Sequence, residues 1–208
     1  MAAKLFLWIT ALVLVGSVAF VRFQAARQEA RVEAAYPPEG RILDVDGVRV
    51  HAVVKGQGPD VVVVHGAGGM TRDYTFAIAD LISDRYRVIL IDRPGLGYTE
   101  RLPGYGAVFS REAETPIEQA ALLRAAAAQL GAERPIVLGH SYGGAVALAW
   151  AVSQPAALSA LVMVAGAANE WEGGLGPLYR ITASPLGGAF VVPLLTAFVP
   201  DWRIRQSV

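Results

Sequence analysis

The residues best suited to chemistry stand together at 139–144, in the order Gly-His-Ser-Tyr-Gly-Gly. Ser141 carries a hydroxyl that can attack an acyl carbon when a neighbouring base removes its proton. The spacing Gly-x-Ser-x-Gly is typical of a nucleophile elbow, a sharp strand-to-helix turn that exposes the serine. Gly139 and Gly143 fit such a turn, because a strained backbone needs neighbours without side chains. The alternative is a glycine-rich turn with an incidental serine, but the apolar strand before it and the amphipathic stretch after it favour the elbow.

A second glycine-rich turn, His65-Gly66-Ala67-Gly68-Gly69, directly follows the apolar run 61–64. A turn at this point can supply one backbone N–H to an oxyanion hole, and the residue after the nucleophile supplies the other. The predicted donors are therefore the N–H groups of Ala67 and Tyr142. A phosphate-binding loop is the other interpretation, but the turn lacks the lysine of a P-loop and the spacing of a dinucleotide fold.

Short apolar runs alternate with amphipathic stretches from residue 41 onward, which predicts a parallel sheet covered by helices. The expected strands are 42–46 and 48–54, joined as a hairpin at Gly47, followed by 60–64, 87–91, 136–138 and 158–164. The expected helices are 71–84, 115–130 and 141–154. For the second of these, Thr115, Pro116 and Glu118 form a capping-box signature, and Gly131 marks the end.

Three motifs together resemble the α/β-hydrolase superfamily over about residues 41–168. They are the turn at 65–69, Asp92-Arg93-Pro94-Gly95-Leu96-Gly97, and the elbow at 139–144. The resemblance implies a mostly parallel, doubly wound α/β sheet, a Ser141 nucleophile, the turn glycine Gly66 and no cofactor. It is closest to the serine branch that holds esterases and haloperoxidase-like proteins. Ser141 argues against the dehalogenase and epoxide-hydrolase branches, which place an aspartate there, and Asp92 resembles a structural loop aspartate.

The chain departs from that pattern after Ser141, where the family places a catalytic acid and a histidine. The later acidic residues are Glu170, Glu172 and Asp201, and no histidine follows. The chain's histidines, His51, His65 and His140, are each expected to be structural. No triad acid or base can therefore be assigned, and we predict a sheet incomplete at its C-terminal side and a truncated enzyme of low activity.

The N-terminal segment contains 17 consecutive uncharged residues, Leu5 to Val21, bounded by Lys4 and Arg22. This length reaches the lower limit of a membrane span, ~17 residues. A cleaved secretory signal is the alternative, although its apolar region should be only ~7–15 residues. We expect an uncleaved anchor helix in a bacterial inner membrane, or a secreted or periplasmic protein if the segment is removed.

Composition narrows the classes of function. Lysine plus arginine and aspartate plus glutamate both number 18, so no basic excess favours nucleic acid. The absence of cysteine excludes disulfides, thiol catalysis and cysteine-based metal sites, and we predict no metal site.

The expected organisation is an anchor helix and linker at 1–35, an α/β-hydrolase core at 36–168, and the start of a helical cap at 169–208. The apolar run 186–199 within the last segment is too short for a span and contains Pro193. The predicted function is hydrolysis of an ester or related acyl bond in a small molecule. The alternative is a non-catalytic, membrane-tethered binding module of the same fold.

Overall fold

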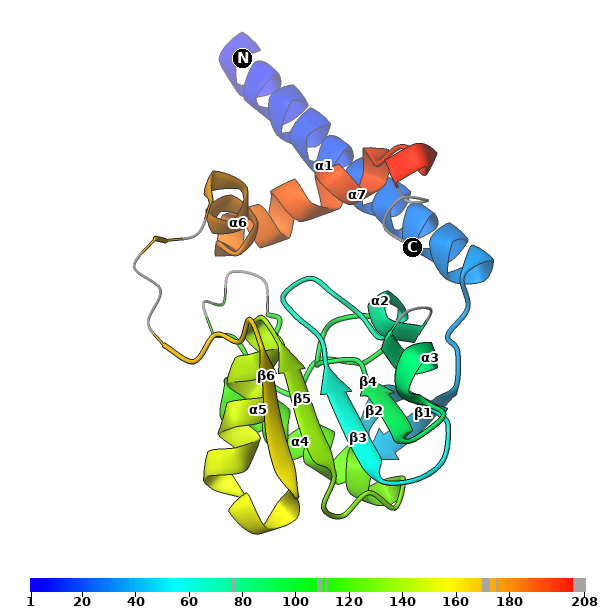
Figure 1. The fold of residues 1–208 in the computed structure, drawn as a ribbon. Coiled ribbons are helices and arrows are strands. Elements are labelled where there is room, and N and C mark those ends of the chain that lie inside the picture. Colours follow the sequence, from blue (N-terminus) through cyan, green and yellow to red (C-terminus); the bar gives the residue numbers. More distant parts are fainter. Residues whose placement is uncertain (76–77, 108–109, 111, 170–172, 175, 204–208) are drawn as a thin grey trace. The chain divides into compact units, whose positions relative to one another are not determined.

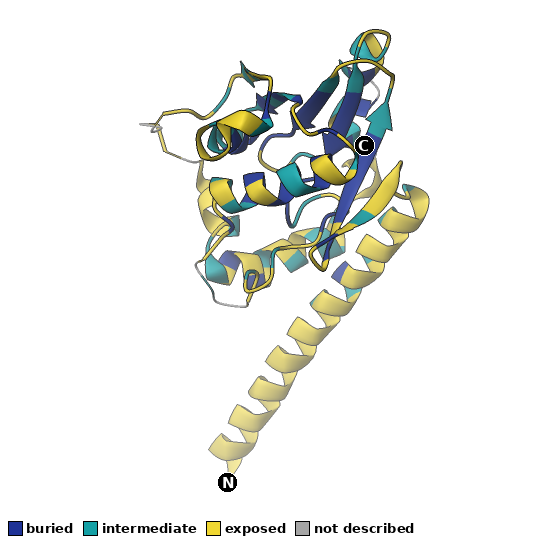
Figure 2. Ribbon diagram, turned by 90° about the horizontal axis from the view of Figure 1, so that it is seen from below, coloured by how far each residue is buried: buried dark blue, intermediate teal, exposed yellow. Residues whose placement is uncertain are grey.

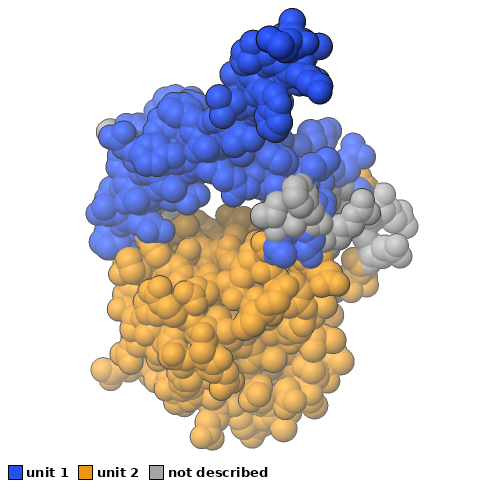
Figure 3. Space-filling model, turned by 180° about the vertical axis from the view of Figure 1, so that it is seen from behind, with its two compact units in different colours: residues 1–37, 107–111, 174–208 blue, residues 38–106, 112–173 orange. Residues whose placement is uncertain are grey.

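A computed structural model describes residues 1–75, 78–107, 110, 112–169, 173–174 and 176–203. The chain divides into two compact units (Figure 3). Unit 1 comprises residues 1–37, 107–111 and 174–208, and unit 2 comprises residues 38–106 and 112–173. Unit 1 thus combines segments that are far apart in the sequence.

Unit 2 is built on a six-stranded sheet with the order β1–β2–β4–β3–β5–β6 (Figure 1). The strands are β1 (Arg41–Val45), β2 (Val48–Lys55), β3 (Asp60–Val64), β4 (Arg87–Ile91), β5 (Ile136–His140) and β6 (Ala160–Val164). β3 is parallel to β4 and β5, and β5 is parallel to β6, whereas β2 is antiparallel to both β1 and β4. The predicted mostly parallel α/β sheet is confirmed. Its first strand is Arg41–Val45 instead of 42–46, with Asp46 in the turn, and its last strand begins at Ala160 instead of 158.

The hairpin predicted at Gly47 is present between β1 and β2. Asp46 and Gly47 have φ angles of 51° and 83°, the positive values that a tight two-residue hairpin turn requires. The Gly47 N–H also donates to Asp44 Oδ1 at 2.8 Å. An Asp-Gly pair supplies this turn at low cost, because glycine and aspartate tolerate positive φ.

Alternate residues of the central strands face two separate cores, as the period of two in a strand requires. One face packs Val62, Ile89 and Val137 against the helices α4 (Pro116–Gln129) and α5 (Tyr142–Ser153). The other face packs Val61, Val63, Val88 and Leu90 against Ala79, in the helix α3 (Ile78–Ile82). Strands buried on both faces explain the continuous valine and isoleucine runs in the sequence.

Local signals set the ends of the two long core helices. At the start of α4 the Thr115 side chain accepts from the Glu118 N–H and the Glu118 carboxylate accepts from the Thr115 N–H, so the predicted capping box is confirmed. Gly131, just beyond its C-cap, has φ 82°. α5 begins immediately after Ser141 and ends at Ser153, before the short 3₁₀ turn η1 (Pro155–Ala157).

The helix expected at 71–84 is described as two shorter helices. These are α2 (Arg72–Thr75) and α3 (Ile78–Ile82). Residues 76 and 77, within the expected helix, lie outside the described residues. Thr71, directly before α2, is buried, and its N–H donates to Asp92 Oδ1 at 2.6 Å.

Unit 1 begins with α1 (Ala2–Ala35), a single helix of 34 residues that ends before Pro37-Pro38. Its 18-residue apolar window is 0% buried, and Figure 2 shows the exposed surface along this helix. α1 is the one helix in the described ranges that is long and apolar enough to cross a membrane, a test that a signal sequence also passes.

The rest of unit 1 consists of α6 (Pro177–Thr182), the π-helical segment η2 (Gly187–Val191) and α7 (Val192–Phe198). Pro193, the second residue of α7, does not interrupt the helix: η2 leads directly into α7. Proline has no N–H to donate to the carbonyl four residues earlier, which here is Ala189 O. That oxygen accepts a hydrogen bond from Arg22 Nη2 of α1 at 2.9 Å, which joins α1 to η2.

Candidate active site

Ser141 occupies a strained turn between β5 and α5. Its φ of 53° and ψ of −123° lie in a region that non-glycine residues rarely occupy, at a cost of about 1–3 kcal/mol. Hydrogen bonds on both sides hold this conformation. The Ser141 N–H donates to Val164 O at 3.0 Å, and the Ser141 carbonyl accepts from Gly144 N at 2.9 Å and Ala167 N at 3.0 Å. The turn is therefore fixed to the end of β6.

Close packing explains the two elbow glycines. A Cβ on Gly139 would lie 2.4 Å from Gly143 O, and a Cβ on Gly143 would lie 2.2 Å from Val64 O. Both neighbours are backbone atoms and cannot move aside. Any other residue at either position would push β5, α5 and β3 apart.

The glycine turn at 65–69 lies against Ser141. A Cβ on Gly66 would lie 3.2 Å from Ser141 Cβ, so the turn and the elbow are in direct contact. Ala67 is exposed, and Tyr142 is the first residue of α5, where a helical N–H has no acceptor within the helix. The positive end of α5 also points toward Ser141.

Arg93 is a buried cation behind this turn. Its Nε donates to His65 O at 3.0 Å, its Nη2 to Gly66 O at 2.9 Å, and its Nη1 to Gln119 Oε1 at 2.9 Å. The guanidinium carbon lies 4.7 Å from the centroid of the Tyr142 ring, within cation–π distance. Burial lowers the pKa of Arg93, yet the guanidinium remains protonated because its ordinary pKa is so high.

No role for Arg93 was predicted from the sequence. Its signal there is a charged residue two positions after the buried strand β4, beside Asp92. One side chain thus holds both segments that carry the predicted oxyanion donors.

His51 and Asp92 form a buried pair, with His51 Nδ1 2.7 Å from Asp92 Oδ2. The other ring nitrogen, Nε2, lies against the carbonyl of Glu39. Both partners are acceptors, so both ring nitrogens carry protons and His51 is an imidazolium. Burial lowers the pKa of His51, but the hydrogen bonds to Asp92 and Glu39 outweigh burial and raise it overall.

Asp92 also accepts from two backbone N–H groups, those of Thr71 at 2.6 Å and Tyr98 at 3.0 Å. Burial raises the pKa of Asp92, and the His51 and backbone hydrogen bonds outweigh that effect and lower it overall. These contacts account for the structural role that the sequence analysis expected of Asp92 and His51.

His65, in contrast to His51, is neutral. Its Nε2 accepts from the backbone N–H of Arg93 at 2.9 Å, and its Nδ1 lies 3.0 Å from Gly66 O. This pattern requires a neutral ring with the proton on Nδ1. Burial is the main cause that lowers the pKa of His65 to about 4. Its contacts hold the glycine turn and the loop after β4 together.

His140 points its Nδ1 at Tyr74 Oη, 2.9 Å away. In the described part of the chain, no histidine nitrogen is hydrogen bonded to the Ser141 hydroxyl. Of the acidic residues after Ser141, Asp201 pairs with Arg31 in unit 1, and Glu170 and Glu172 lie outside the described residues. Within the described ranges, no group of three potential ligands gathers to hold a metal ion.

A family model described as the alpha/beta hydrolase fold matches residues 59–181, more than half of the chain. A pimeloyl-[acyl-carrier protein] methyl ester esterase from Aeromonas hydrophila is 37% identical over 123 residues, which cover 57% of this chain and 44% of the relative. A 2-hydroxy-6-oxononadienedioate/2-hydroxy-6-oxononatrienedioate hydrolase from Klebsiella pneumoniae is 31% identical over 174 residues, which cover 80% of this chain and 54% of the relative.

Solved structures agree on the fold. The crystal structure of the epoxide hydrolase VrEH1 from Vigna radiata superposes with a TM-score of 0.55 at 24% identity, covering 70% of this chain and 43% of the other. The chain spans only between 33% and 54% of the length of the curated relatives that it matches.

Proposed function

The chain belongs to the α/β-hydrolase fold family, and from that membership we propose that it carries the nucleophile half of a serine hydrolase. Ser141 would attack an ester or related acyl bond of a small molecule. The observation that carries the proposal is the backbone of Ser141, strained at φ 53° and held between β5 and α5. A serine kept in a costly conformation at the end of a buried strand has a position that folding alone does not require.

The surroundings of Ser141 support an oxyanion hole made by the N–H groups of Ala67 and Tyr142. Gly66 places the glycine turn against Ser141 Cβ, and α5 adds its positive end. Each such donor contributes about 3–4 kcal/mol of transition-state stabilisation. Gly139 and Gly143 allow this arrangement, because a side chain at either would separate the elbow from β3.

The histidines give weight to the second candidate function, a binding module without catalysis. His51, His65 and His140 are each hydrogen bonded to another residue. Because no base among the described residues is hydrogen bonded to its hydroxyl, Ser141 should react slowly. The activity that remains would come from the oxyanion donors and from binding, roughly 10³–10⁴-fold above water.

Chemical rescue can separate the two functions. The full chain is incubated in detergent micelles with a fluorophosphonate, with and without added imidazole, and adducts are located by mass spectrometry. Ser141 Oγ bonds to phosphorus, fluoride leaves, and imidazole takes the serine proton. We expect slow labelling at Ser141 that accelerates with imidazole and is absent in Ser141→Ala.

Two results would decide against the catalytic proposal. Labelling of the wild type that equals that of Ser141→Ala at every imidazole concentration would remove Ser141 as a nucleophile. Labelling spread over other hydroxyls at the same rate would show that Ser141 has no special reactivity. Either result favours the binding module.

We also propose that α1 is an uncleaved membrane anchor. The apolar N-terminal half of α1 is exposed, and the helix continues beyond it to Ala35. The continuation is structured, since Arg22, Gln28 and Arg31 contact the segment 189–201. If the apolar run were instead removed as a cleaved signal, the mass of the protein recovered from the native membrane fraction would show the loss.

A further inference from the structure

The segment Pro177–Val191, here called the α6–η2 element, carries large apolar side chains on its surface. Those that are exposed are Leu178, Tyr179, Ile181, Leu186 and Phe190. Leu178 and Leu186 are 61% and 64% exposed, values expected of polar residues on a water-facing helix. An apolar surface of this kind marks a contact with a membrane or a partner.

The element is joined to α1 where the apolar run of α1 ends. Arg22, the first charged residue after that run, donates to Ala189 O. Gln28 then donates to Val199 O, and Arg31 pairs with Asp201. The segment 189–201 therefore follows α1 away from the apolar run, over a rise of roughly 14 Å for the nine residue steps from Arg22 to Arg31. The α6–η2 element lies at the end nearest the apolar run.

We propose that the α6–η2 element is an in-plane membrane contact that inserts into the same bilayer leaflet through which α1 emerges. The inference rests on the proposed membrane anchor α1. A bilayer fits as the occupant because the apolar surface continues from a helix of spanning length, and because Arg22 places Ala189 at the boundary between hydrocarbon and headgroups.

The element is too short to cross a membrane. α6 has six residues, and η2 with α7 forms one helix, Gly187–Phe198; at 1.5 Å per residue these are roughly 9 and 18 Å long, against a hydrocarbon core of about 30 Å. Short helices with one apolar side lie in the interface and bury that side by about 5–10 Å.

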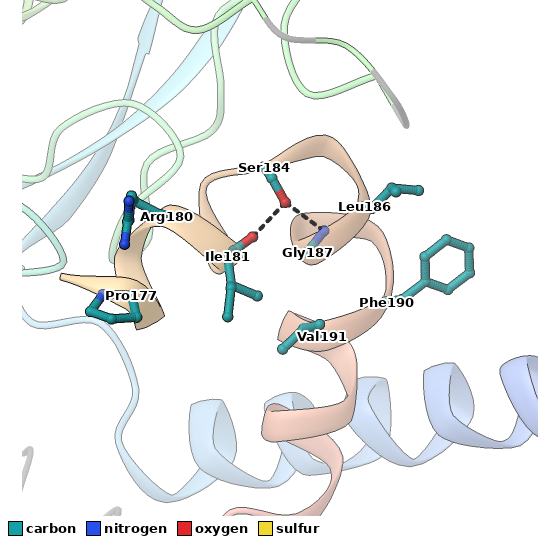
Figure 4. Close-up of a pocket in the computed structure, with 8 residues that line it drawn as sticks. All are labelled: Pro177, Arg180, Ile181, Ser184, Leu186, Gly187, Phe190 and Val191. Carbon is teal, nitrogen blue, oxygen red and sulfur yellow. Dashed lines mark hydrogen bonds between the residues drawn. The ribbon is translucent and has the colours of Figure 1, made fainter. Parts of the chain in front are cut away.

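The side chains of the element suit an interface. Tyr179 combines an apolar ring with a hydroxyl, and Arg180 combines an aliphatic stem with a charge, so both can keep a polar tip at the headgroups. Arg180 also lines a groove of about 720 Å³ between α6 and η2, together with Pro177, Ile181, Ser184, Leu186, Gly187, Phe190 and Val191. Figure 4 shows Ser184 bridging Ile181 O and Gly187 N, which closes the turn between the two helices. This mostly apolar groove with one cation matches an acyl chain beside an anionic headgroup.

The absence of cysteine allows a direct test on the full chain. Single cysteines replace exposed leucines, in Leu178→Cys and Leu186→Cys for the element, Leu12→Cys for α1, and Leu81→Cys as the matched control in unit 2, where the leucine is 76% exposed. Each is labelled with a nitroxide and reconstituted in vesicles of phosphatidylcholine and phosphatidylglycerol. Collision rates with oxygen, which partitions into lipid, and with a water-soluble nickel chelate are measured by electron paramagnetic resonance.

We expect the ratio of oxygen to nickel collisions to be highest at Leu12, intermediate at Leu178 and Leu186, and severalfold lower at Leu81. A ratio at both element positions equal to that at Leu81, with Leu12 in lipid, would overturn the inference and leave the anchor intact. Aqueous values at Leu12 as well would remove both. Labels at 178 and 186 shielded from both reagents would show that protein, and not lipid, covers the element, which also overturns the inference. Circular dichroism confirms that each labelled variant is folded.

Discussion

His51 and His65 lie at the two ends of the Asp92 carboxylate, and the first is charged while the second is neutral. Oδ2 of Asp92 is 2.7 Å from Nδ1 of His51, whereas Oδ1 is 3.9 Å from Nε2 of His65. His51 donates from both ring nitrogens, whereas His65 must accept at Nε2, because the backbone N–H of Arg93 donates to that nitrogen. The hydrogen-bond partners, and not the distance to the carboxylate, decide which ring is charged.

The two histidines should therefore give stability opposite dependences on pH. The pKa of His65 is lowered to about 4, so its contribution is complete above its ordinary pKa near 6.5 and is lost as the pH falls from 6.5 to 4. Over this range of pH, the free energy of unfolding should fall by about 3 kcal/mol because of His65. The pKa of His51 is raised, so its contribution is complete below 6.5 and is lost as the pH rises through its folded-state pKa.

Urea unfolding at a series of pH values, for the wild type and His65→Gln, checks this assignment. Glutamine can accept from the Arg93 N–H but cannot become charged, so the acid-side slope between pH 6.5 and 4 should flatten. His51→Gln is the matched variant, which should keep that slope. An unchanged acid slope in His65→Gln would show that His65 is not the group that titrates.

Gly143→Ala should destabilise unit 2 by about 3 kcal/mol or more, at the upper end of overpacking effects. The new methyl group would lie 2.2 Å from Val64 O and 2.5 Å from His65 O, both backbone atoms. Gly188→Ala is the control, because its nearest neighbour would be 3.6 Å away. Thermal unfolding in micelles, followed by circular dichroism, compares the two variants. Equal melting temperatures would contradict the close contact between α5 and β3.

Ser141→Gly should be more stable than the wild type by about 1 kcal/mol, since glycine adopts φ 53° without the strain that serine carries. Ser141→Ala keeps the Cβ and the strain, so its stability should match that of the wild type. Both variants remove the hydroxyl, so a difference between their stabilities measures the backbone strain at position 141. If Ser141→Gly is no more stable than Ser141→Ala under urea, the elbow is not strained.

Arg93→Lys should cost roughly 3 kcal/mol of stability, because an ammonium cannot replace three separately placed guanidinium bonds and leaves buried acceptors unpaired. Labelling of Ser141 by a fluorophosphonate should slow in parallel, since Gly66 and Tyr142 both lose their contact with the guanidinium. Arg85→Lys, at a side chain that is 79% exposed, should change neither. Loss of stability with an unchanged labelling rate would limit Arg93 to a role in folding.

Sequence patterns predicted those parts of the fold whose causes are local. The valine runs mark the buried strands, Thr115 and Glu118 mark the start of α4, and Gly47 marks the hairpin. The contacts that complete the site are not local. His51 and Asp92 are 41 residues apart, and Arg93 reaches Gln119 across 26 residues. No periodicity or spacing in the chain encodes such a pairing, so only the folded sheet reveals it.

The role of Pro193 was also beyond sequence patterns. Proline predicts a break in a helix, but the π-helical turn of η2 and the guanidinium of Arg22 together allow the helix to continue. The partner of the Ala189 carbonyl comes from α1, 167 residues earlier.

That separation has a consequence for biosynthesis. α1 leaves the ribosome first, whereas the residues that contact Arg22, Gln28 and Arg31 come 167–171 positions later, after the six strands that the structure describes. Closing so long a loop is entropically costly unless the intervening chain has already folded. Unit 1 therefore assembles after unit 2, and the C-terminal half of α1 stays without these contacts until the segment 189–201 has been synthesised.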